Sequence, residues 1–179
     1  MTEVTLVRLG LDSATNSYVV VLRELDGRRL LPIWIGQPEA ESIVLQINGV
    51  KRDRPLTHDL CKALLVALGG TLERVEITRV LKSTYYAELH ITTPSGRVIV
   101  DARPSDSLAV ALRCDAPIFA ADDLLTTVEV EDDDDEDEGP SFGLPMPGLM
   151  PTPRGEMTPE QLKAYLEQLR PEDFGKFTP

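Results

Sequence analysis

The chain has 179 residues, with 18 Lys and Arg against 30 Asp and Glu, a formal net charge of −12 and two cysteines. This composition is typical of a globular protein with one ordinary domain and an extension. It excludes two classes: no apolar run reaches the roughly 18 residues of a membrane span, and two cysteines cannot cross-link a secreted scaffold of this length. The first residues lack the layout of a secretory signal, so we expect a cytoplasmic protein.

The acidic charge is unevenly distributed. Residues 1–124 carry 14 basic and 16 acidic side chains, whereas residues 125–179 carry 4 and 14. The isoelectric point near 4.6 argues against nonspecific polyanion binding, because phosphates must be met by Lys or Arg. The nearly neutral body nevertheless leaves room for a local basic patch.

The beginning of the chain predicts a β-meander followed by a helix. The expected strands are rich in Val and Leu and lie at 3–12, 17–25 and 28–35. Asp26-Gly27 is a hairpin signal, because a type I′ turn needs positive φ angles. Apolar residues then recur with helical spacing between Pro38, which suits a first turn, and Asn48-Gly49, which suits a helix end.

The rest of the body predicts two more helices and a second set of strands. We expect a helix capped by Thr57, strands at 71–81, 84–93 and 97–102, a helix capped by Ser105, and a short strand at 117–120. Each helix carries an apolar stripe, formed by Leu60, Ala63, Leu64, Ala67 and Leu68 in one and by Leu108, Ala109, Ala111 and Leu112 in the other.

This order groups helices between antiparallel hairpins and does not alternate strand and helix regularly. We therefore expect an α+β fold: a strongly bent, mostly antiparallel sheet that partly closes into a barrel and is covered by two or three helices. Residues 1–124 form this domain.

The C-terminal part has a different composition. Nine of the ten residues at 129–138 are acidic, and the residues that follow are rich in Pro and Gly. This composition predicts that residues 125–157 form a disordered linker. Residues 158–179 begin with a capping box, Thr158-Pro159-Glu160-Gln161, and predict a short amphipathic helix. So short a helix is marginal alone, so we expect it to dock on the body, on a sister subunit or on another protein.

Common catalytic motifs are absent: there is no GxGxxG after a strand, no GxxxxGK[ST], no HExxH and no GxSxG. Cys61 and Cys114 each lie among apolar neighbours on a predicted helix, which favours packing over chemistry. His90 lies inside a predicted strand, and we interpret it as an ordinary strand residue.

Two stretches place Arg and Asp at predicted helix starts, residues 52–59 and 101–106. A helix N-terminus offers free N–H groups and partial positive charge, and an arginine fork can hold two phosphate oxygens. The candidate phosphate-binding residues are therefore Arg52, Arg54, Arg103 and Ser105.

The same stretches contain groups for metal and proton chemistry. Carboxylates are preferred ligands of Mg²⁺ and Mn²⁺, and His58 could transfer a proton near neutral pH. The candidate metal ligands are Asp59, Asp101 and Asp106, with Glu39 as a weaker candidate. With His58 these three aspartates form the candidate catalytic set for metal-assisted phosphodiester hydrolysis. The alternative stays open: Asp, Ser and Thr at helix starts are also ordinary caps, and an arginine beside such an Asp can simply pair with it.

Four segments in a fixed order resemble the bifunctional nuclease domain family, over about residues 3–124. They are LPIWIGQPEAESI (31–43), RPLTHDL (54–60), YYAEL (85–89) and DARPSDSLAVALRCDAPIF (101–119). The resemblance implies an α+β fold with a strongly bent sheet, cleavage of DNA and RNA, and assembly into homo-oligomers. The residue roles given above are inferred from chemistry and are not supplied by the family.

Three functional hypotheses follow. The first is a nuclease that acts on DNA, RNA or both, assisted by Mg²⁺ or Mn²⁺. The second is a non-catalytic oligomeric binding or regulatory module, in which the motif residues are caps and residues 158–170 form the docking element. The third is a module that binds a nucleotide or small anion at the helix starts without hydrolysis.

Overall fold

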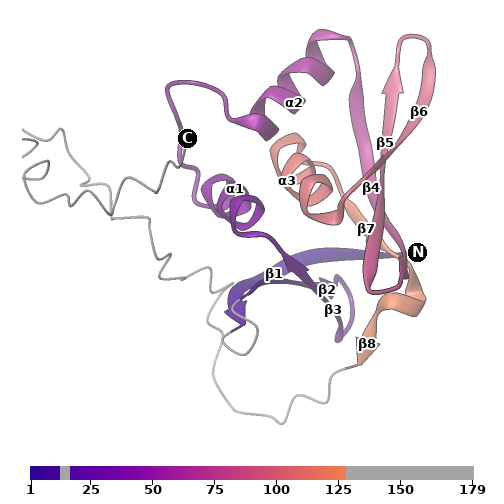
Figure 1. Ribbon diagram of the computed structural model, residues 1–179. Helices are drawn as coiled ribbons and strands as arrows, with labels where there is room; N and C mark the ends of the chain where they lie inside the picture. The colour runs from indigo at the N-terminus through magenta and orange to yellow at the C-terminus, as the bar shows by residue number, and fades with distance from the viewer. Residues whose placement is uncertain (13–16, 128–179) are drawn as a thin grey trace, which may run out of the picture. The chain divides into compact units, whose positions relative to one another are not determined.

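The computed structural model describes residues 1–12 and 17–127. Within these ranges the chain forms one eight-stranded sheet and three α-helices (Figure 1). The predicted C-terminal helix at 158–179, and the predicted linker at 125–157 from residue 128 on, lie outside the described residues.

The elements follow the predicted order. The strands are β1 (Thr2–Asp12), β2 (Ser17–Glu24), β3 (Arg29–Ile35), β4 (Thr71–Leu81), β5 (Thr84–Thr93), β6 (Gly96–Ala102), β7 (Ile118–Ala120) and β8 (Thr126–Thr127). The helices are α1 (Gln37–Ile47), α2 (Thr57–Ala67), α3 (Pro104–Cys114) and a short 3₁₀ helix, η1 (Asp122–Leu124). Every predicted strand and helix within residues 1–124 is therefore present, whereas η1 and β8 were not predicted.

The sheet is open and mostly antiparallel. Its strand order is β6-β5-β4-β7-β1-β2-β3-β8, and the one parallel pair is β4 with β7. The α+β class is thus confirmed, but the predicted partial closure into a barrel is wrong, because β6 and β8 are opposite edges. β8 has only two residues, which is too short to extend the sheet toward β6. In Figure 1, β1–β3 run across the direction of β4–β6.

Two turns show how local sequence sets the strand connections. Lys82 and Ser83, between β4 and β5, have φ angles of 48° and 62°, as a two-residue type I′ hairpin requires. The turn at Asp26-Gly27 also joins two antiparallel strands, but the connection spans residues 25–28 and is wider than a two-residue turn.

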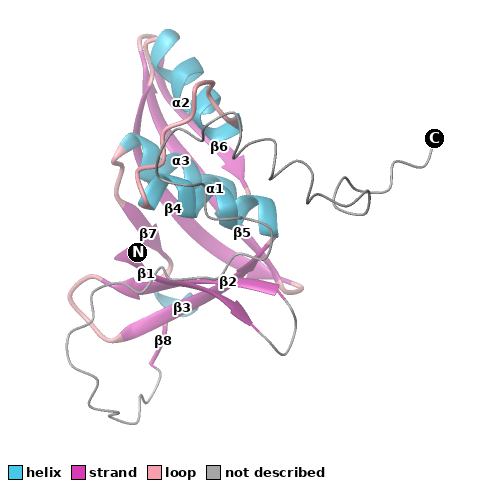
Figure 2. Cartoon of the chain, turned by 90° about the vertical axis from the view of Figure 1, so that its left-hand side faces the viewer, coloured by secondary structure: helices cyan, strands magenta, loops and turns pink. Residues whose placement is uncertain are grey.

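The three helices lie together, with α3 between α1 and α2 and packed on β4 and β5 (Figure 2). The predicted inward face of α3 is confirmed for Leu108, Ala109 and Ala111, which are completely buried. They meet a core that includes Val75 and Ile77 of β4. Full burial of each large apolar side chain contributes about 1.5–3 kcal/mol, so α3 is the most firmly anchored helix.

Helix α2 is different, because none of its residues is buried. No described part of the chain covers its predicted apolar stripe: the exposed fractions of Leu60, Leu64 and Leu68 are 51%, 54% and 76%. Cys61 on the same helix is also exposed. Polar groups at the start of α2 therefore carry much of its attachment to α1 and α3. No helix in the described part of the chain has the length and apolar character of a membrane span.

Candidate active site

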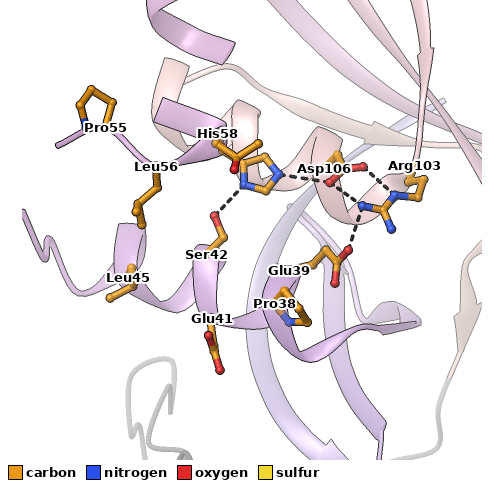
Figure 3. A pocket seen from close by; sticks show the side chains of 11 residues that line it. Pro38, Glu39, Glu41, Ser42, Leu45, Pro55, Leu56, His58, Arg103 and Asp106 are labelled. Carbon is orange, nitrogen blue, oxygen red and sulfur yellow. Dashed lines mark hydrogen bonds and ion pairs between the residues drawn. The ribbon is translucent and has the colours of Figure 1, made fainter. Parts of the chain in front are cut away.

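A pocket of about 570 Å³ lies where the first turns of the three helices meet. Pro38 and Glu39 of α1 line it, together with Thr57 at the start of α2 and Arg103 and Asp106 at the start of α3 (Figure 3). A helix N-terminus carries a partial positive charge. Three such termini around one pocket make it a suitable place for an anion such as a phosphate.

Both predicted N-caps are shifted from the positions that sequence indicated. Helix α3 begins with Pro104 at its first position, which makes Arg103 the N-cap in place of Ser105. Helix α2 has Leu56 as its N-cap in place of Thr57, because the carboxylate of Asp59 accepts a hydrogen bond from the Leu56 N–H at 2.9 Å. The Asp59 side chain thus satisfies the N–H of the N-cap residue itself, whereas a Thr57 cap would have accepted a hydrogen bond from an N–H two or three residues later.

His58 connects all three helices through both of its ring nitrogens. Its Nδ1 lies 2.7 Å from the Ser42 Oγ on α1, and its Nε2 lies 3.1 Å from the Asp106 Oδ1 on α3. The His58 side chain is 12% exposed, and all three residues line the pocket. The imidazole is therefore held in one orientation at the pocket wall (Figure 3).

Arg103 extends this chain of contacts to Glu39. Its Nε and Nη2 donate to the two Asp106 carboxylate oxygens at 2.7 and 3.0 Å, and Nη2 also lies 2.8 Å from the Glu39 Oε1. The hydrogen bond and charge of Asp106 raise the pKa of Arg103. The side chain is 65% exposed, and within the described residues no hydrogen bond uses its Nη1 group. A guanidinium held in this way can present Nη1 to a ligand in the pocket.

The Asp106 carboxylate is ionised in this arrangement. Burial raises its pKa, but the hydrogen bond and charge of Arg103, together with the hydrogen bond from His58, outweigh burial, so its pKa lies below the usual value. The pocket is also lined by Glu39, which pairs with the same guanidinium, and by Glu41, so its lining holds three acidic side chains and one arginine. An anionic substrate there would be assisted by an additional cation.

Asp59 faces away from this chain of contacts and pairs with Arg113. The Asp59 Oδ1 lies 2.5 Å from the Arg113 Nε, and the hydrogen bond from Arg113 lowers the Asp59 pKa. Arg113 is 4% exposed and also donates to the carbonyl oxygens of Ala109 and Ser42, at 2.9 and 3.2 Å. This buried guanidinium joins α2 to α1 and α3 beneath the pocket.

The lowered pKa values of Asp59 and Asp106 predict loss of stability in acid. Each of these carboxyl groups has a lower pKa in the folded protein than in the unfolded chain. Its contribution to the stability of the fold is therefore complete when the pH is above the pKa of the unfolded chain, and it is lost as the pH falls through the pKa of the folded protein. We expect urea midpoints to be constant from neutral pH down to about pH 5 and to fall below about pH 4. The fall should be smaller for Asp106→Asn than for the exposed control Asp26→Asn, and equal falls would contradict this assignment.

The remaining predicted site residues lie outside the pocket. Asp101 is exposed on β6 opposite Glu88, and Ser105 is buried inside the first turn of α3. Arg52 and Arg54 are exposed in the loop between α1 and α2. The structure thus brings together His58, Asp106, Arg103 and Glu39, and it does not bring Asp59 or Asp101 to them.

Another group of possible metal ligands lies on β4 and β5. Among the described residues, one set of three has its ligand atoms within 4.8 Å of one another: Glu76, Glu88 and His90. The Nη2 of Arg74 lies 3.1 Å from the His90 Nδ1 and can only donate, so Nδ1 accepts and the ring hydrogen is on Nε2, which faces the carboxylates. The Nε2 lies 3.2 Å from the Glu76 Oε2 and 3.6 Å from the Glu88 Oε2, yet among the described residues it is a buried nitrogen without a hydrogen-bond partner.

Two residues of the site were missed by sequence reasoning, Ser42 and Arg113. Ser42 lies beside the apolar face of α1, within the segment 31–43 that carries the family resemblance, but no signal in one sequence indicates its partner on α2. Arg113 lies in the last turn of α3, where a basic residue is an ordinary complement to the helix dipole. Its burial depends on how the three helices pack, which sequence spacing does not reveal.

A second pocket, of about 430 Å³, adjoins the first and shares Thr57, His58, Arg103 and Asp106 with it. Its other walls are mostly apolar and are formed by Cys61, Leu65, Leu72, Leu89, Ile91 and Val110. The His58–Asp106 pair therefore lies between a pocket rich in charged groups and an apolar one. Such a pair of surfaces suits a ligand with a charged group beside a flat apolar one.

Comparison with known sequences identifies the family. Residues 20–133 match the sequence profile of the bifunctional nuclease domain. The chain belongs to the bifunctional nuclease domain family. All three segments that line the charged pocket, 38–45, 55–58 and 103–106, lie within the matched residues.

Individual relatives of this bifunctional nuclease domain protein differ in how much they cover. An uncharacterized protein of Mycobacterium tuberculosis is 38% identical over 174 residues, 97% of this chain and 98% of its own length. Bifunctional nuclease 2 of Oryza sativa subsp. japonica is 31% identical over 103 residues, 55% of this chain and 32% of its own. Bifunctional nuclease 1 of Oryza sativa subsp. indica is 26% identical over 110 residues, 60% of this chain and 33% of its own. The match thus covers about a third of each plant protein.

Proposed function

We propose that this protein is a nuclease that hydrolyses phosphodiester bonds of DNA, RNA or both in the pocket between the three helix starts. The observation that carries the proposal is His58, held between Ser42 and Asp106 at the wall of that pocket. A neutral imidazole in a fixed orientation is the usual general base of hydrolytic enzymes. Membership of a family whose plant relatives are named bifunctional nucleases supports the choice of substrate.

Each part of the pocket has a role in this proposal. Arg103 binds the phosphate through its Nη1 group, and the three helix termini add positive potential. The apolar pocket beside His58 receives a base or sugar of the nucleic acid. Asp106 keeps the imidazole oriented and compensates the charge that His58 gains when it takes a proton.

The proposal includes assistance by Mg²⁺ or Mn²⁺. Glu39 and Asp106 would hold the ion, since they line the same pocket and offer the hard oxygen ligands that these cations prefer. The Arg103 Nη2, which lies 2.8 and 3.0 Å from these two carboxylates, would then turn from them toward the phosphate. When bound, the ion would neutralise charge on the phosphate. Asp59 and Asp101 are not part of this donor set, because neither lines the pocket.

The test is cleavage of labelled DNA and RNA by purified protein in EDTA, Mg²⁺ or Mn²⁺. The wild type should cleave, and Asp106→Asn purified in parallel should lose the activity. The matched control is Asp26→Asn, because Asp26 is exposed in the turn between β2 and β3 and does not line the pocket. Equal cleavage by wild type and Asp106→Asn would reveal a contaminant or a different site.

Cation binding has a readout that does not depend on activity. Mn²⁺ added without nucleic acid should raise the unfolding temperature of wild type and of Asp26→Asn, because a ligand that binds the folded state stabilises it. It should raise that of Asp106→Asn less. An equal shift in all three proteins would contradict cation binding in this pocket, but it would not contradict the proposed nuclease function.

A further inference from the structure

The hydroxyl of Ser42 has a position that its role in helix α1 does not explain. Serine inside a helix commonly bonds the carbonyl oxygen four residues earlier, as Ser107 does with the Arg103 oxygen at 2.9 Å. The Ser42 Oγ instead lies 2.7 Å from the His58 Nδ1, in the wall of the charged pocket (Figure 3). This hydroxyl is therefore oriented toward a potential base.

The hydrogen-bond roles around His58 follow from its second partner. An ionised Asp106 carboxylate can only accept a hydrogen bond, so the Nε2 that faces it at 3.1 Å carries the hydrogen of the neutral ring. Nδ1 then has a free lone pair and accepts the hydrogen of the Ser42 hydroxyl. The order hydroxyl, imidazole, carboxylate is that of the Ser-His-Asp hydrolases, with the two ring nitrogens exchanged.

The backbone at Ser42 is held in place independently of this hydroxyl. The carbonyl oxygen of Ser42 accepts a hydrogen bond from the Arg113 Nη2 at 3.2 Å, and the side chain is nearly buried, with the residue 8% exposed. The hydroxyl thus has a fixed position at the pocket wall. A nucleophile held in this way loses little entropy when it reacts.

We propose that Ser42 is the nucleophile of the cleavage reaction, which rests on the nuclease function proposed above. The Oγ attacks the phosphorus while its proton moves to the His58 Nδ1. The bond from phosphorus to the leaving nucleoside oxygen breaks, and that oxygen takes the proton from His58 through a water molecule. The product is a phosphodiester that joins Ser42 to the retained nucleoside.

Hydrolysis of this intermediate completes the cycle. A water molecule gives a proton to the His58 Nδ1 and attacks the same phosphorus, the bond to the Ser42 Oγ breaks, and Oγ recovers the proton. The net reaction is addition of one water across one phosphodiester bond. Two in-line displacements at phosphorus retain its configuration, whereas direct attack by water inverts it.

The decisive experiment is the stereochemical course at phosphorus. The full chain cleaves a DNA oligonucleotide that carries a single phosphorothioate of known configuration, in ¹⁸O-labelled water. DNA is required, because the 2′-hydroxyl of RNA could itself act as a nucleophile. Retention of configuration is expected. Inversion with normal cleavage would overturn the Ser42 proposal alone, whereas a wild type that cleaves neither DNA nor RNA in the assay described under the proposed function would overturn the nuclease function as well.

Two further measurements locate the intermediate. Acid quenching during turnover, followed by mass spectrometry, should show a nucleotide adduct on the peptide that contains Ser42. Ser42→Ala should lose the adduct and at least about 10²-fold in rate. The matched control is Ser107→Ala, a buried helical serine outside the pocket, which should keep both. A Ser42→Ala protein that still cleaves at the wild-type rate would overturn the proposal.

Discussion

Replacing His58 with glutamine should lower the rate of nucleic acid cleavage by about 10²–10⁴-fold, the usual contribution of a positioned general base. Glutamine has a similar reach and can keep a hydrogen bond to Asp106, but it cannot take a proton near neutral pH. The loss should appear in single-turnover rates at saturating protein, so that weaker substrate binding does not account for it.

The matched control is His90→Gln, which changes the other histidine of the chain. His90 lies on β5 beside Glu76 and lines neither pocket next to His58. This control should cleave at the wild-type rate. Circular dichroism and the unfolding temperature of both variants establish that they are folded. A folded His58→Gln protein with wild-type activity would remove His58 from the mechanism.

The fold was largely predictable because its elements follow local patterns. Alternating Val and Leu indicated the strands, and the spacing of apolar residues indicated three helices. Barrel closure was not predictable, because it depends on pairing between edge strands that are distant in the sequence. Such pairing requires β6 and β8 to have compatible lengths, and β8 has two residues that carry no strand signal of their own.

The site was predictable only where it coincides with a helix start. Arg103 and Asp106 share one turn, so their contact follows from helical spacing. Asp101 was grouped with them because it is near in sequence, but it belongs to β6 and the strand ends before Arg103. The link from His58 to Ser42 joins residues 16 apart on two helices, and it exists because α1 and α2 both pack beside α3. No local pattern encodes that contact.

The structural reading of the Arg/Asp motifs, a cap or a local ion pair, is realised at Asp59, and the ion-pair part of it also at Asp106. Asp59 caps α2 through the Leu56 N–H and pairs with a buried arginine, which is the structural role considered for such residues. Asp106, three residues after Arg103, faces His58 and lines a pocket. Similar sequence surroundings thus lead to different roles, because α2 and α3 present their third residues to different neighbours.

Replacing Asp59 with asparagine should lower the free energy of unfolding by about 3 kcal/mol, because loss of one partner leaves the buried charge of Arg113 uncompensated. The lower part of the range for buried pairs is expected, since the Asp59 side chain is 37% exposed and Arg113 keeps two carbonyl partners. Urea unfolding followed by circular dichroism measures the change, with Asp26→Asn as the exposed control. A loss no greater than that of the control would contradict the role given to this pair.

A double variant separates the ion pair from other effects of substitution. Asp59→Leu combined with Arg113→Met removes both charges, so it should destabilise the protein less than the sum of the two single changes.

Arg113 also holds the Ser42 carbonyl oxygen, so the Asp59→Asn protein should lose activity although Asp59 lies outside the pocket. If that loss arises from displaced helices, excess Mg²⁺ or Mn²⁺ will not restore the rate. A metal-ligand role would instead give a protein as stable as wild type that needs more cation.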